Sequence, residues 1–544
     1  MRRLLALIFI FTTLDFAQTP ASRVDALFHR WANPQSPGCA VAVIQDGKPV
    51  HQRGYGMANL EHAIPVTPES AFYLGSTSKQ FTAMAVLQLV ELGRVKLDDS
   101  IRKYLRQLPA LLEPVTIRHL LEHTSGVRDY IALWNLAGPA EDAALSTEET
   151  FSLILRQKEL NFAPGEEFLY SNSGYFLLGL VAGPAAFRQL SDLARETIFD
   201  PLGLKHTRYH PDRFRILPGR ATGYSPATEG GYRINTQTLD VIGAGGIFTT
   251  LEDLILWDRV FSNPPGTHAR VVERMMTPGK LAGGETSEYG QGMMLKQYRG
   301  FPIASHPGGL RGYRSEILRF PVQKLSILCL CNASDAEAGV LARQVADIFL
   351  PPSPAAVQPK LRLEDLKRKE GVFLDPVSGD LLKTWEQNGM FFAEFNGLVL
   401  PLRAETALRF RAIESPVDFT IDFRSAGARD DPSFLRVHSE TQRPARFERV
   451  TLFTAPPANI AEFAGEYASE EAQARYSVKV FENQIQFFQR EHMIGEMIPT
   501  VADRFRMGSL NLEFHRDANK KIVGFRLNTG RVRRLWFSLL PSIP

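Results

Sequence analysis

The sequence is poor in cysteine and in net charge, and each shortage excludes a class of protein. Three cysteines among 544 residues are too few for a disulfide-stapled scaffold, and no Cys-x-x-Cys pair is present to bind zinc. Lys and Arg total 62 against 59 Asp and Glu, so the formal charge is only +3. That balance lacks the basic surplus of nucleic-acid-binding proteins. We therefore expect no nucleic acid partner.

Long apolar runs are also missing, and the N-terminal one is short. Met1-Arg2-Arg3 gives a positive start, residues 4–14 are largely apolar, and Asp15 ends the run. A bilayer span needs about 20 such residues. The layout is instead typical of a secretory signal peptide, which we assign to residues 1–21. We expect an exported protein, periplasmic or secreted, without a transmembrane span in the mature chain.

The three cysteines lie in two predicted strands. Cys39 begins one of them, while Cys329 and Cys331 share one face of another, so either could meet Cys39 if the two strands are neighbours. Cysteine is among the residues most often found buried as a free thiol. We expect buried thiols rather than a disulfide.

The hydrophobic share of 44% is ordinary for a folded protein, and the length predicts several domains. Residues 22–350 carry predicted strands at both ends, 39–45 and 50–55 at the start and 325–331 near the close. Amphipathic helical spacing lies between them, at 80–92 and 116–122. This order predicts a mixed α/β domain whose terminal strands join one sheet. A proline-rich linker, 351–360, ends it.

Beyond the linker the pattern changes to short alternating runs, which predict an all-β region. The all-β region contains an internal repeat. Gly371-Val372-Phe373 resembles Gly465-Glu466-Tyr467, and Arg409-Phe410-Arg411 resembles Arg504-Phe505-Arg506. We interpret residues 361–455 and 456–544 as two antiparallel barrel-like repeats. A single larger β domain is the alternative.

The first chemically informative motif is Ser76-x-x-Lys79, where a glycine turn opens a predicted helix. Residues three apart share a helix face, so the Lys79 amine can lie beside the Ser76 hydroxyl. A helix N-terminus is partially positive, which favours a developing alkoxide and a neutral lysine. The pattern is typical of an activated serine nucleophile.

Two further segments complete a candidate site. Tyr170 and Asn172 precede an apolar helix, where a phenol could act as a base beside a cation and an amide could grip a substrate carbonyl. His306-Pro307-Gly308-Gly309 precedes a predicted strand over 315–319. Glycine there lets substrate approach the backbone, and the amides of Gly309 and Ser76 could form an oxyanion hole.

Taken in order, these three motifs resemble those of the serine β-lactamase and penicillin-binding protein superfamily, and most of all its class C β-lactamase and D-aminopeptidase (S12 peptidase) branch. Further landmarks are Gly54-Tyr55-Gly56, His123-Thr124-Ser125-Gly126 and Asp200-Pro201-Leu202-Gly203-Leu204. The resemblance covers about residues 23–350. It implies a β-lactamase/transpeptidase-like α/β (α+β) fold with an antiparallel sheet flanked by helices, and D-aminopeptidases of the branch also carry two C-terminal β-barrels.

The resemblance also implies roles for residues. Ser76 would be the acylated nucleophile, Lys79 the proton acceptor and Tyr170 a base or relay. Asn172, His306, Gly308 and Gly309 would bind substrate, with the Ser76 and Gly309 amides as oxyanion donors. No metal or organic cofactor is implied. The partner would be a small-molecule or peptide substrate, including peptidoglycan-derived ones; no oligomeric state is indicated.

His306 is the main departure from the family pattern, because β-lactamases usually carry lysine there. A histidine is largely neutral above a pKa of about 6.5, which disfavours binding of a β-lactam carboxylate. We therefore expect a serine hydrolase of small amides or esters, with D-amino-acid peptides first and β-lactams second. Arg311 and Arg314 follow the motif, and we interpret them as structural rather than as carboxylate-binding residues.

Three other interpretations of the same residues stay open. One is a carboxylesterase of the same fold. Another is a non-catalytic peptide- or peptidoglycan-binding protein on a hydrolase fold. The third is a zinc peptidase, because His119-Leu120-Leu121-Glu122-His123 spells the inverted zincin pattern. Residues 243–246, Gly-Ala-Gly-Gly, are interpreted as a close-packed turn rather than a nucleotide loop.

Overall fold

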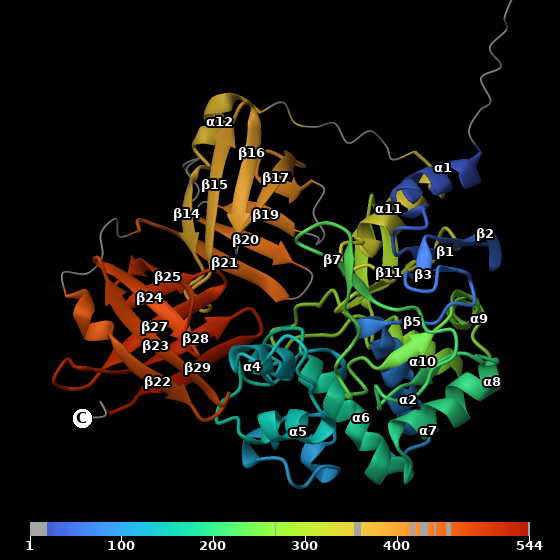
Figure 1. Cartoon of the computed structure of the whole chain (residues 1–544), viewed down its shortest axis with the longest axis horizontal. Helices are drawn as coiled ribbons and strands as arrows, with labels where there is room; N and C mark the ends of the chain where they lie inside the picture. The colour runs from blue at the N-terminus through green and yellow to red at the C-terminus, as the bar shows by residue number, and fades with distance from the viewer. Residues whose placement is uncertain are drawn as a thin grey trace, which may run out of the picture.

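Figure 1 shows the computed structural model of the chain. The structure describes residues 19–266, 268–352, 359, 361–395, 397–413, 419–424, 433–439, 442–452 and 459–541. The expected signal peptide lies almost entirely outside these residues. So do most of the expected linker 351–360 and residues 453–458, where the two repeats were expected to meet.

A six-stranded antiparallel sheet forms the centre of the first domain, and its strand order is β10-β11-β12-β13-β1-β2. The strands are β10 (Met294–Tyr298), β11 (Phe301–Leu310), β12 (Tyr313–Phe320), β13 (Leu325–Cys331), β1 (Cys39–Gln45) and β2 (Lys48–Tyr55). The first strands of the domain therefore pair with its last, as the sequence predicts. The antiparallel sheet with helices beside it confirms the expected fold class.

Alternate residues of β1 supply two different cores, because successive side chains of a strand point to opposite faces. Ala40, Ala42 and Ile44 pack toward the helical body, whereas Cys39, Val41 and Val43 belong to the core with α1 (Pro20–Leu27) and α11 (Ala338–Phe349). Both sides are covered, so β1 is apolar throughout rather than alternating.

The helical body packs against one face of the sheet (Figure 1). Its helices are α2 (Lys79–Glu91), α3 (Ile117–Leu121), α4 (Tyr130–Leu136), α5 (Thr147–Leu155), α6 (Asn172–Ala186), α7 (Leu190–Ala194), α8 (Asp200–Leu202), α9 (Leu251–Ser262) and α10 (His268–Met275). Short strands lie among them: β3 (Met57–Asn59), β4 (Ile64–Pro65), β5 (Phe72–Tyr73), β6 (Arg208–Tyr209), β7 (Tyr224–Pro226), β8 (Tyr232–Ile234) and β9 (Ile247–Thr249).

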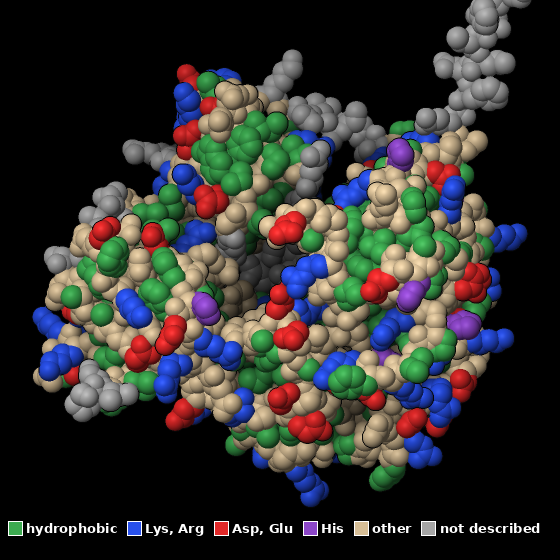
Figure 2. Space-filling view, viewed as in Figure 1, with side chains coloured by type: hydrophobic (Ala, Val, Ile, Leu, Met, Phe, Trp, Pro, Cys, Tyr) green, Lys and Arg blue, Asp and Glu red, His purple; other side chains and the backbone are tan. Residues whose placement is uncertain are grey.

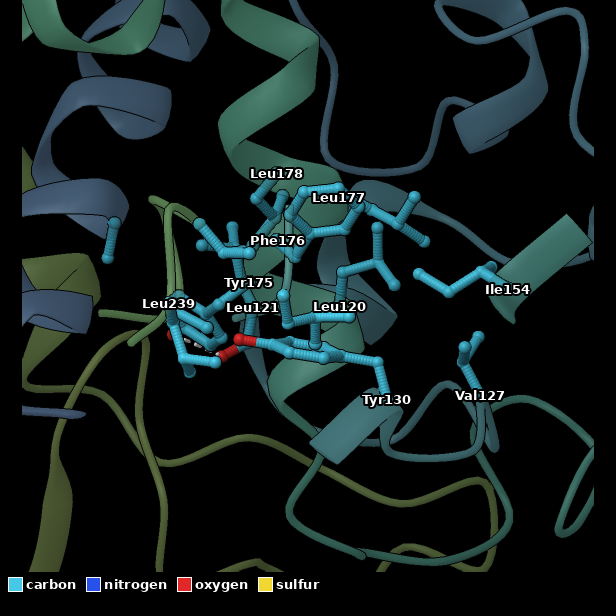
Figure 3. Packing of buried hydrophobic residues seen from close by; sticks show 14 of the residues in the cluster. Leu120, Leu121, Val127, Tyr130, Ile154, Tyr175, Phe176, Leu177, Leu178 and Leu239 are labelled. Carbon is cyan, nitrogen blue, oxygen red and sulfur yellow. Dashed lines mark hydrogen bonds between the residues drawn. The ribbon is translucent and has the colours of Figure 1, made fainter. Parts of the chain in front are cut away.

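Helix α2, expected to be amphipathic, is buried on nearly every side. It contacts α6, α7 and α10, so no face of its first three turns remains for solvent. Figure 3 shows the adjoining core, in which Tyr130 of α4 and Leu120 of α3 pack against Tyr175 and Phe176 of α6. The start of α6 is therefore held rigidly from two sides.

The expectation of three free thiols is wrong. Cys39 of β1 is bonded to Cys331 of β13, and Cys329 alone is a free, buried cysteine. The strand register explains the choice, because Cys39 lies directly opposite Cys331, whereas Cys329 lies opposite Val41. Directly opposed residues on antiparallel strands bring their Cβ atoms close enough for a disulfide.

The all-β region forms two closed antiparallel barrels of eight strands each. The first follows α12 (Leu363–Lys367) and consists of β14 (Gly371–Leu374), β15 (Leu381–Gln387), β16 (Met390–Phe395), β17 (Leu398–Ala404), β18 (Arg409–Ala412), β19 (Phe419–Arg424), β20 (Phe434–Ser439) and β21 (Gln442–Val450). The second consists of β22 (Gly465–Ser469), β23 (Ala474–Phe481), β24 (Gln484–Gln489), β25 (His492–Val501), β26 (Arg504–Met507), β27 (Leu510–Arg516), β28 (Ile522–Thr529) and β29 (Val532–Leu539). Closure leaves neither barrel a free sheet edge.

The second barrel is docked on the helical body beside α4 and α5 (Figure 1). The Tyr476 hydroxyl donates a hydrogen bond of 2.7 Å to the Leu136 carbonyl oxygen, and apolar side chains of both units form one continuous core. On the visible surface, acidic and basic side chains are intermixed (Figure 2). Within the described part of the chain, no helix is long and apolar enough to cross a membrane.

Candidate active site

Ser76 lies in a short 3-10 turn, Gly75–Ser78, between β5 and α2. The turn is fixed to β11, because the Thr77 hydroxyl donates to the His306 carbonyl oxygen at 3.0 Å. Ser315 of β12 adds a hydrogen bond from its hydroxyl to the Leu74 carbonyl oxygen at 2.8 Å. Ser76 therefore has a fixed position at the N-terminus of α2, and it is half-buried.

Lys79 is fully buried and its Nζ contacts three oxygens. They are Ser76 Oγ at 3.1 Å, Asn172 Oδ1 at 2.8 Å and the Ala244 carbonyl oxygen at 2.8 Å. Burial is the main cause that holds the pKa of Lys79 well below its usual range; the nearby Arg531 lowers it further, while Asp129 opposes the shift. A neutral amine has two hydrogens and one lone pair. In the neutral form, donation of both hydrogens to the two carbonyl oxygens would leave the lone pair for the Ser76 hydroxyl.

Asn172 is the first residue of α6, and Asp129 sets its orientation. The Asp129 Oδ2 accepts from the Asn172 backbone N–H at 2.6 Å and from its side-chain Nδ2 at 2.8 Å. Because the amide nitrogen is bound to a carboxylate, its oxygen is the atom that faces Lys79. Asp129 is itself 1% exposed. It thus positions Asn172 without facing solvent.

Tyr170 is buried, with the Lys79 Nζ 4.8 Å from its ring centroid. Its hydroxyl has no hydrogen bond of good geometry within the described residues, although the Ser76 side chain is close enough to favour its ionised form. Burial dominates and raises the pKa of Tyr170 above its usual range. The phenol is therefore protonated at neutral pH.

His123 supports this tyrosine from behind. Its ring centroid lies 4.2 Å from that of Tyr170, and its Nδ1 accepts a hydrogen bond from the Ser171 backbone N–H at 3.1 Å. Burial, the first cause, and the neighbouring Lys79 hold the pKa of His123 well below its usual range. The neutral ring thus fixes the segment that carries Tyr170 and Asn172.

His306 lies in the wall of the site and is 1% exposed. Its Nδ1 is 2.8 Å from the Pro307 carbonyl oxygen and its Nε2 is 3.1 Å from the Tyr289 hydroxyl. A carbonyl can only accept, so Nδ1 carries the hydrogen and Nε2 accepts from Tyr289. Burial, with a contribution from Lys79, lowers the pKa of His306 to about 3. This position therefore holds a neutral ring, as its departure from lysine predicts.

The glycines of the third motif lie within β11 rather than in a loop before a strand, which corrects the expected placement. Gly308 touches the Ser76 turn, since a Cβ there would lie 1.9 Å from the Leu74 carbonyl oxygen. Gly75 has φ +55°, and a Cβ on it would lie 2.7 Å from the Gly309 nitrogen. The Gly309 N–H therefore lies next to the Ser76 turn, where an oxyanion donor is needed.

The residues of the inverted zincin pattern are not brought together. Helix α3 ends at Leu121, and His123 follows it with φ +56°. The His119 Nδ1 instead accepts from the Thr116 backbone N–H, and Glu122 accepts from Gln291. Among the described residues, the closely spaced ligand-type side chains are the three cysteines, two of them disulfide-bonded.

Three contributors to the site carry no sequence motif. Ala244 supplies a backbone oxygen from the turn 243–246, Asp129 precedes α4, and Arg531 comes from the second barrel. The turn is close-packed, as predicted, since a Cβ on Gly243 would lie 2.5 Å from the Tyr175 carbonyl oxygen. Asp129 is the N-cap residue of α4, which is a structural role and does not mark a functional one.

Arg311 and Arg314 make internal contacts. The Arg314 Nη1 donates to the backbone oxygens of Arg311 and Tyr313, both at 2.8 Å, and Arg311 donates to Thr238. Arg314 lies beside Gly309, 3.6 Å from where a Cβ would be. These contacts agree with the structural interpretation of both arginines.

The chain resembles D-aminopeptidases over much of its length. One from Gluconobacter oxydans is 27% identical over 468 residues, which cover 84% of this chain and 83% of that protein. Another from Brucella anthropi is 32% identical over 298 residues, 55% of this chain and 56% of that protein.

Solved structures show the same fold. A penicillin-binding protein homologue from Pyrococcus abyssi has a TM-score of 0.55 at 24% identity and covers 77% of this chain and 98% of its own. The D-amino acid amidase from Ochrobactrum anthropi SV3 has a TM-score of 0.51 at 22% identity, covering 60% and 97%. The Beta-lactamase family matches residues 24–349, more than half of the chain. The protein therefore belongs to the Beta-lactamase family and is a serine hydrolase of its acyl-transfer type.

Proposed function

We propose that this enzyme hydrolyses peptides and small amides that contain D-amino acids, through an ester formed on Ser76. The observation that carries the proposal is the environment of Lys79, a buried amine whose Nζ lies 3.1 Å from Ser76 Oγ and whose pKa is held well below its usual range. A buried neutral lysine beside a serine serves as a general base. The D-amino acid specificity is supported by the D-aminopeptidase relatives.

In acylation, Ser76 Oγ gives its proton to Lys79 Nζ and forms a bond to the substrate carbonyl carbon. The carbonyl electrons move to the oxygen, which the N–H groups of Gly309 and Ser76 stabilise. The tetrahedral species collapses as the C–N bond breaks, and the leaving nitrogen takes a proton. Tyr170, protonated and next to Ser76, is placed to pass that proton from Lys79 to the leaving group.

In deacylation, water attacks the ester carbon and gives a proton to the same pair of groups. The Ser76–carbon bond then breaks, Ser76 Oγ regains a proton, and a carboxylic acid is released. No step needs a charge on His306, whose pKa of about 3 leaves it neutral. Its neutrality agrees with amide substrates ahead of β-lactams, because no permanent cation occupies the third motif to bind the β-lactam carboxylate.

The test is intact mass after incubation with a fluorophosphonate, followed by hydrolysis of the neutral substrate N-acetyl-D-alanine p-nitroanilide and its L-isomer. Wild type should gain one adduct and prefer the D-isomer, and Ser76→Ala should lose both adduct and turnover. Ser171→Ala is the matched control, because its buried hydroxyl has no partner in the described residues and should keep the adduct. Labelling that persists in Ser76→Ala, or equal cleavage of both isomers, would contradict the proposal.

We also propose export to an oxidising compartment. The signal-like N-terminus supports it, and so does the Cys39–Cys331 disulfide, because disulfides persist outside the reducing cytosol. Cell fractionation and N-terminal sequencing of the mature protein should find it outside the cytoplasm and shortened near residue 21. A full-length cytoplasmic protein would overturn this assignment.

A further inference from the structure

The hairpin between β28 and β29 brings a charged side chain of the second barrel into the active site. Arg531 lies at its tip, and its carbonyl oxygen accepts from Asn161 Nδ2 at 3.0 Å. The Asn161 Oδ1 in turn accepts from the Arg533 backbone N–H at 2.8 Å. These two bonds from one side chain of the catalytic domain clamp both sides of the tip, so the position of Arg531 is fixed.

The Arg531 guanidinium reaches the reacting groups. Its Cζ lies 4.7 Å from the centroid of the Tyr170 ring, and its positive charge also lowers the pKa of Lys79. About a third of the side chain remains exposed, at 34%. Arg531 is therefore a partly exposed cation beside Tyr170 and Lys79, the two residues next to the nucleophile.

The carboxylates around the hairpin are already committed to other groups. Asp129 binds the Asn172 amide and main chain at 2.6–2.8 Å and is 3.9 Å from Arg531. Glu167 pairs with Arg533, and Glu159 pairs with Arg526, both at 3.1 Å. Within the described residues, the Arg531 side chain makes no hydrogen bond. Its contacts are the ion pair with Asp129 at 3.9 Å and the Tyr170 ring, so its N–H donors remain available to a ligand.

We propose that Arg531 is a specificity-determining residue that binds a substrate carboxylate next to the scissile bond and disfavours a free ammonium there. The inference rests on the proposed function and narrows its substrate class to anionic D-amino acid derivatives. Guanidinium and carboxylate match as paired donors and acceptors. An α-ammonium in the same place would face the Arg531 guanidinium, while the neighbouring carboxylate of Asp129 is already bound to Asn172 and lies 3.9 Å from Arg531.

The experiment compares substrates that differ in charge alone, on either side of the scissile bond. On the acyl side, N-succinyl-D-alanine p-nitroanilide is anionic, N-acetyl-D-alanine p-nitroanilide is neutral and D-alanine p-nitroanilide carries an ammonium. On the leaving side, N-acetyl-D-alanyl-D-alanine is compared with its C-terminal amide. In either the acyl-side or the leaving-side series, wild type should show a kcat/KM for the anionic substrate about tenfold to a hundredfold above that for the neutral one. That factor is the one expected for a charged hydrogen bond.

The variants ask whether Arg531 causes that preference. Arg531→Gln should bring the ratio of anionic to neutral kcat/KM close to one, Arg531→Glu should reverse it, and Arg531→Lys should keep part of it. Arg526→Gln is the matched control, because it removes another arginine that joins the same barrel to the catalytic domain, at Glu159. Arg526→Gln should leave the ratio of anionic to neutral kcat/KM as in wild type. If weaker docking of the barrel were the cause of a changed ratio, this variant would change it too.

Two results would overturn the inference. One is a wild type that prefers the ammonium substrate in the acyl series. The other is an anion preference that survives in Arg531→Gln and disappears in Arg314→Gln, a variant of the arginine beside Gly309. Failure of the proposed function is distinct, since Ser76 would then be unlabelled by fluorophosphonate and the neutral D-substrate would not be cleaved.

Discussion

At the scale of the residue, the protonation state of Lys79 governs activity. Its pKa is depressed, mainly by burial, and the base must be unprotonated, so kcat/KM should rise as the pH rises through that pKa. Arg531 contributes to the depression, so removing its charge should raise the pKa and move the rising limb to higher pH. The pH profile of a neutral D-substrate in Arg531→Gln checks this. Arg531→Lys keeps the charge, so its rising limb should stay at the wild-type pH. A rising limb that stays at the wild-type pH in Arg531→Gln as well would contradict an effect of Arg531 on the pKa of Lys79.

A second residue-scale prediction concerns Asp129, a positioning residue. Asp129→Ala removes the acceptor that orients the Asn172 amide, which frees the amide to turn its nitrogen toward Lys79. We expect kcat/KM to fall about tenfold or more, which corresponds to one lost charged hydrogen bond. Asp129→Asn keeps an acceptor oxygen and should restore part of the activity. If both variants were as active as wild type, Asp129 would have no positioning role.

The sequence predicts the residues that act within one motif better than those that meet across the fold. Ser76 and Lys79 are three apart on one turn, so their contact follows from local geometry. Asp129 and Arg531 reach the site from distant positions, and no local spacing signals them. His123 appeared as half of a zinc pattern, because the pattern assumes a helix that in fact ends at Leu121.

At the scale of the element, activity depends on how closely β11 approaches the Ser76 turn. Gly308→Ala would place a Cβ 1.9 Å from the Leu74 carbonyl oxygen, so strand and turn would have to separate. We expect loss of both fluorophosphonate labelling and D-peptide cleavage. Gly183→Ala in α6 is the control, since a Cβ there meets nothing within 4 Å and should be tolerated. Normal labelling of Gly308→Ala would show that the contact is dispensable.

The sequence predicted most elements but not their registers. The strands 39–45 and 325–331 appear with the predicted bounds, because apolar runs of that length are strong signals. The partner of Cys39 depends on a two-residue difference in register that neither strand encodes alone. The third motif was predicted to precede a strand, yet β11 continues through its proline and glycines, which are residue types that weaken strand patterns.

At the scale of the whole molecule, the sequence indicated the two barrels as a repeat. It did not indicate that the second barrel contributes to the active site. The second barrel shares a core with the catalytic domain and supplies Arg531. Around the shared core, charged side chains pair across the interface, as Arg526 does with Glu159. Such pairing joins surfaces far apart in the chain, which the composition of either segment does not reveal.

The docking itself can be tested at its buried ion pair. Arg128 and Glu471 lie 2.7 Å apart, with side chains 0% and 7% exposed, and Arg128 is next to the residue that orients Asn172. Glu471→Ala leaves the Arg128 charge buried without its partner, which should reduce stability by about 3–5 kcal/mol.

Replacing both partners, as Arg128→Met with Glu471→Leu, removes the unpaired charge and should recover most of that loss. Denaturant unfolding followed by tryptophan fluorescence measures both variants beside wild type. Lys158→Ala with Glu470→Ala removes the neighbouring exposed pair and should leave the unfolding midpoint close to that of wild type, because solvent screens such a pair. If Glu471→Ala were as stable as wild type, the second barrel would not be held by this pair, and its position would depend on the other interface contacts, such as those of Asn161 and the shared apolar core.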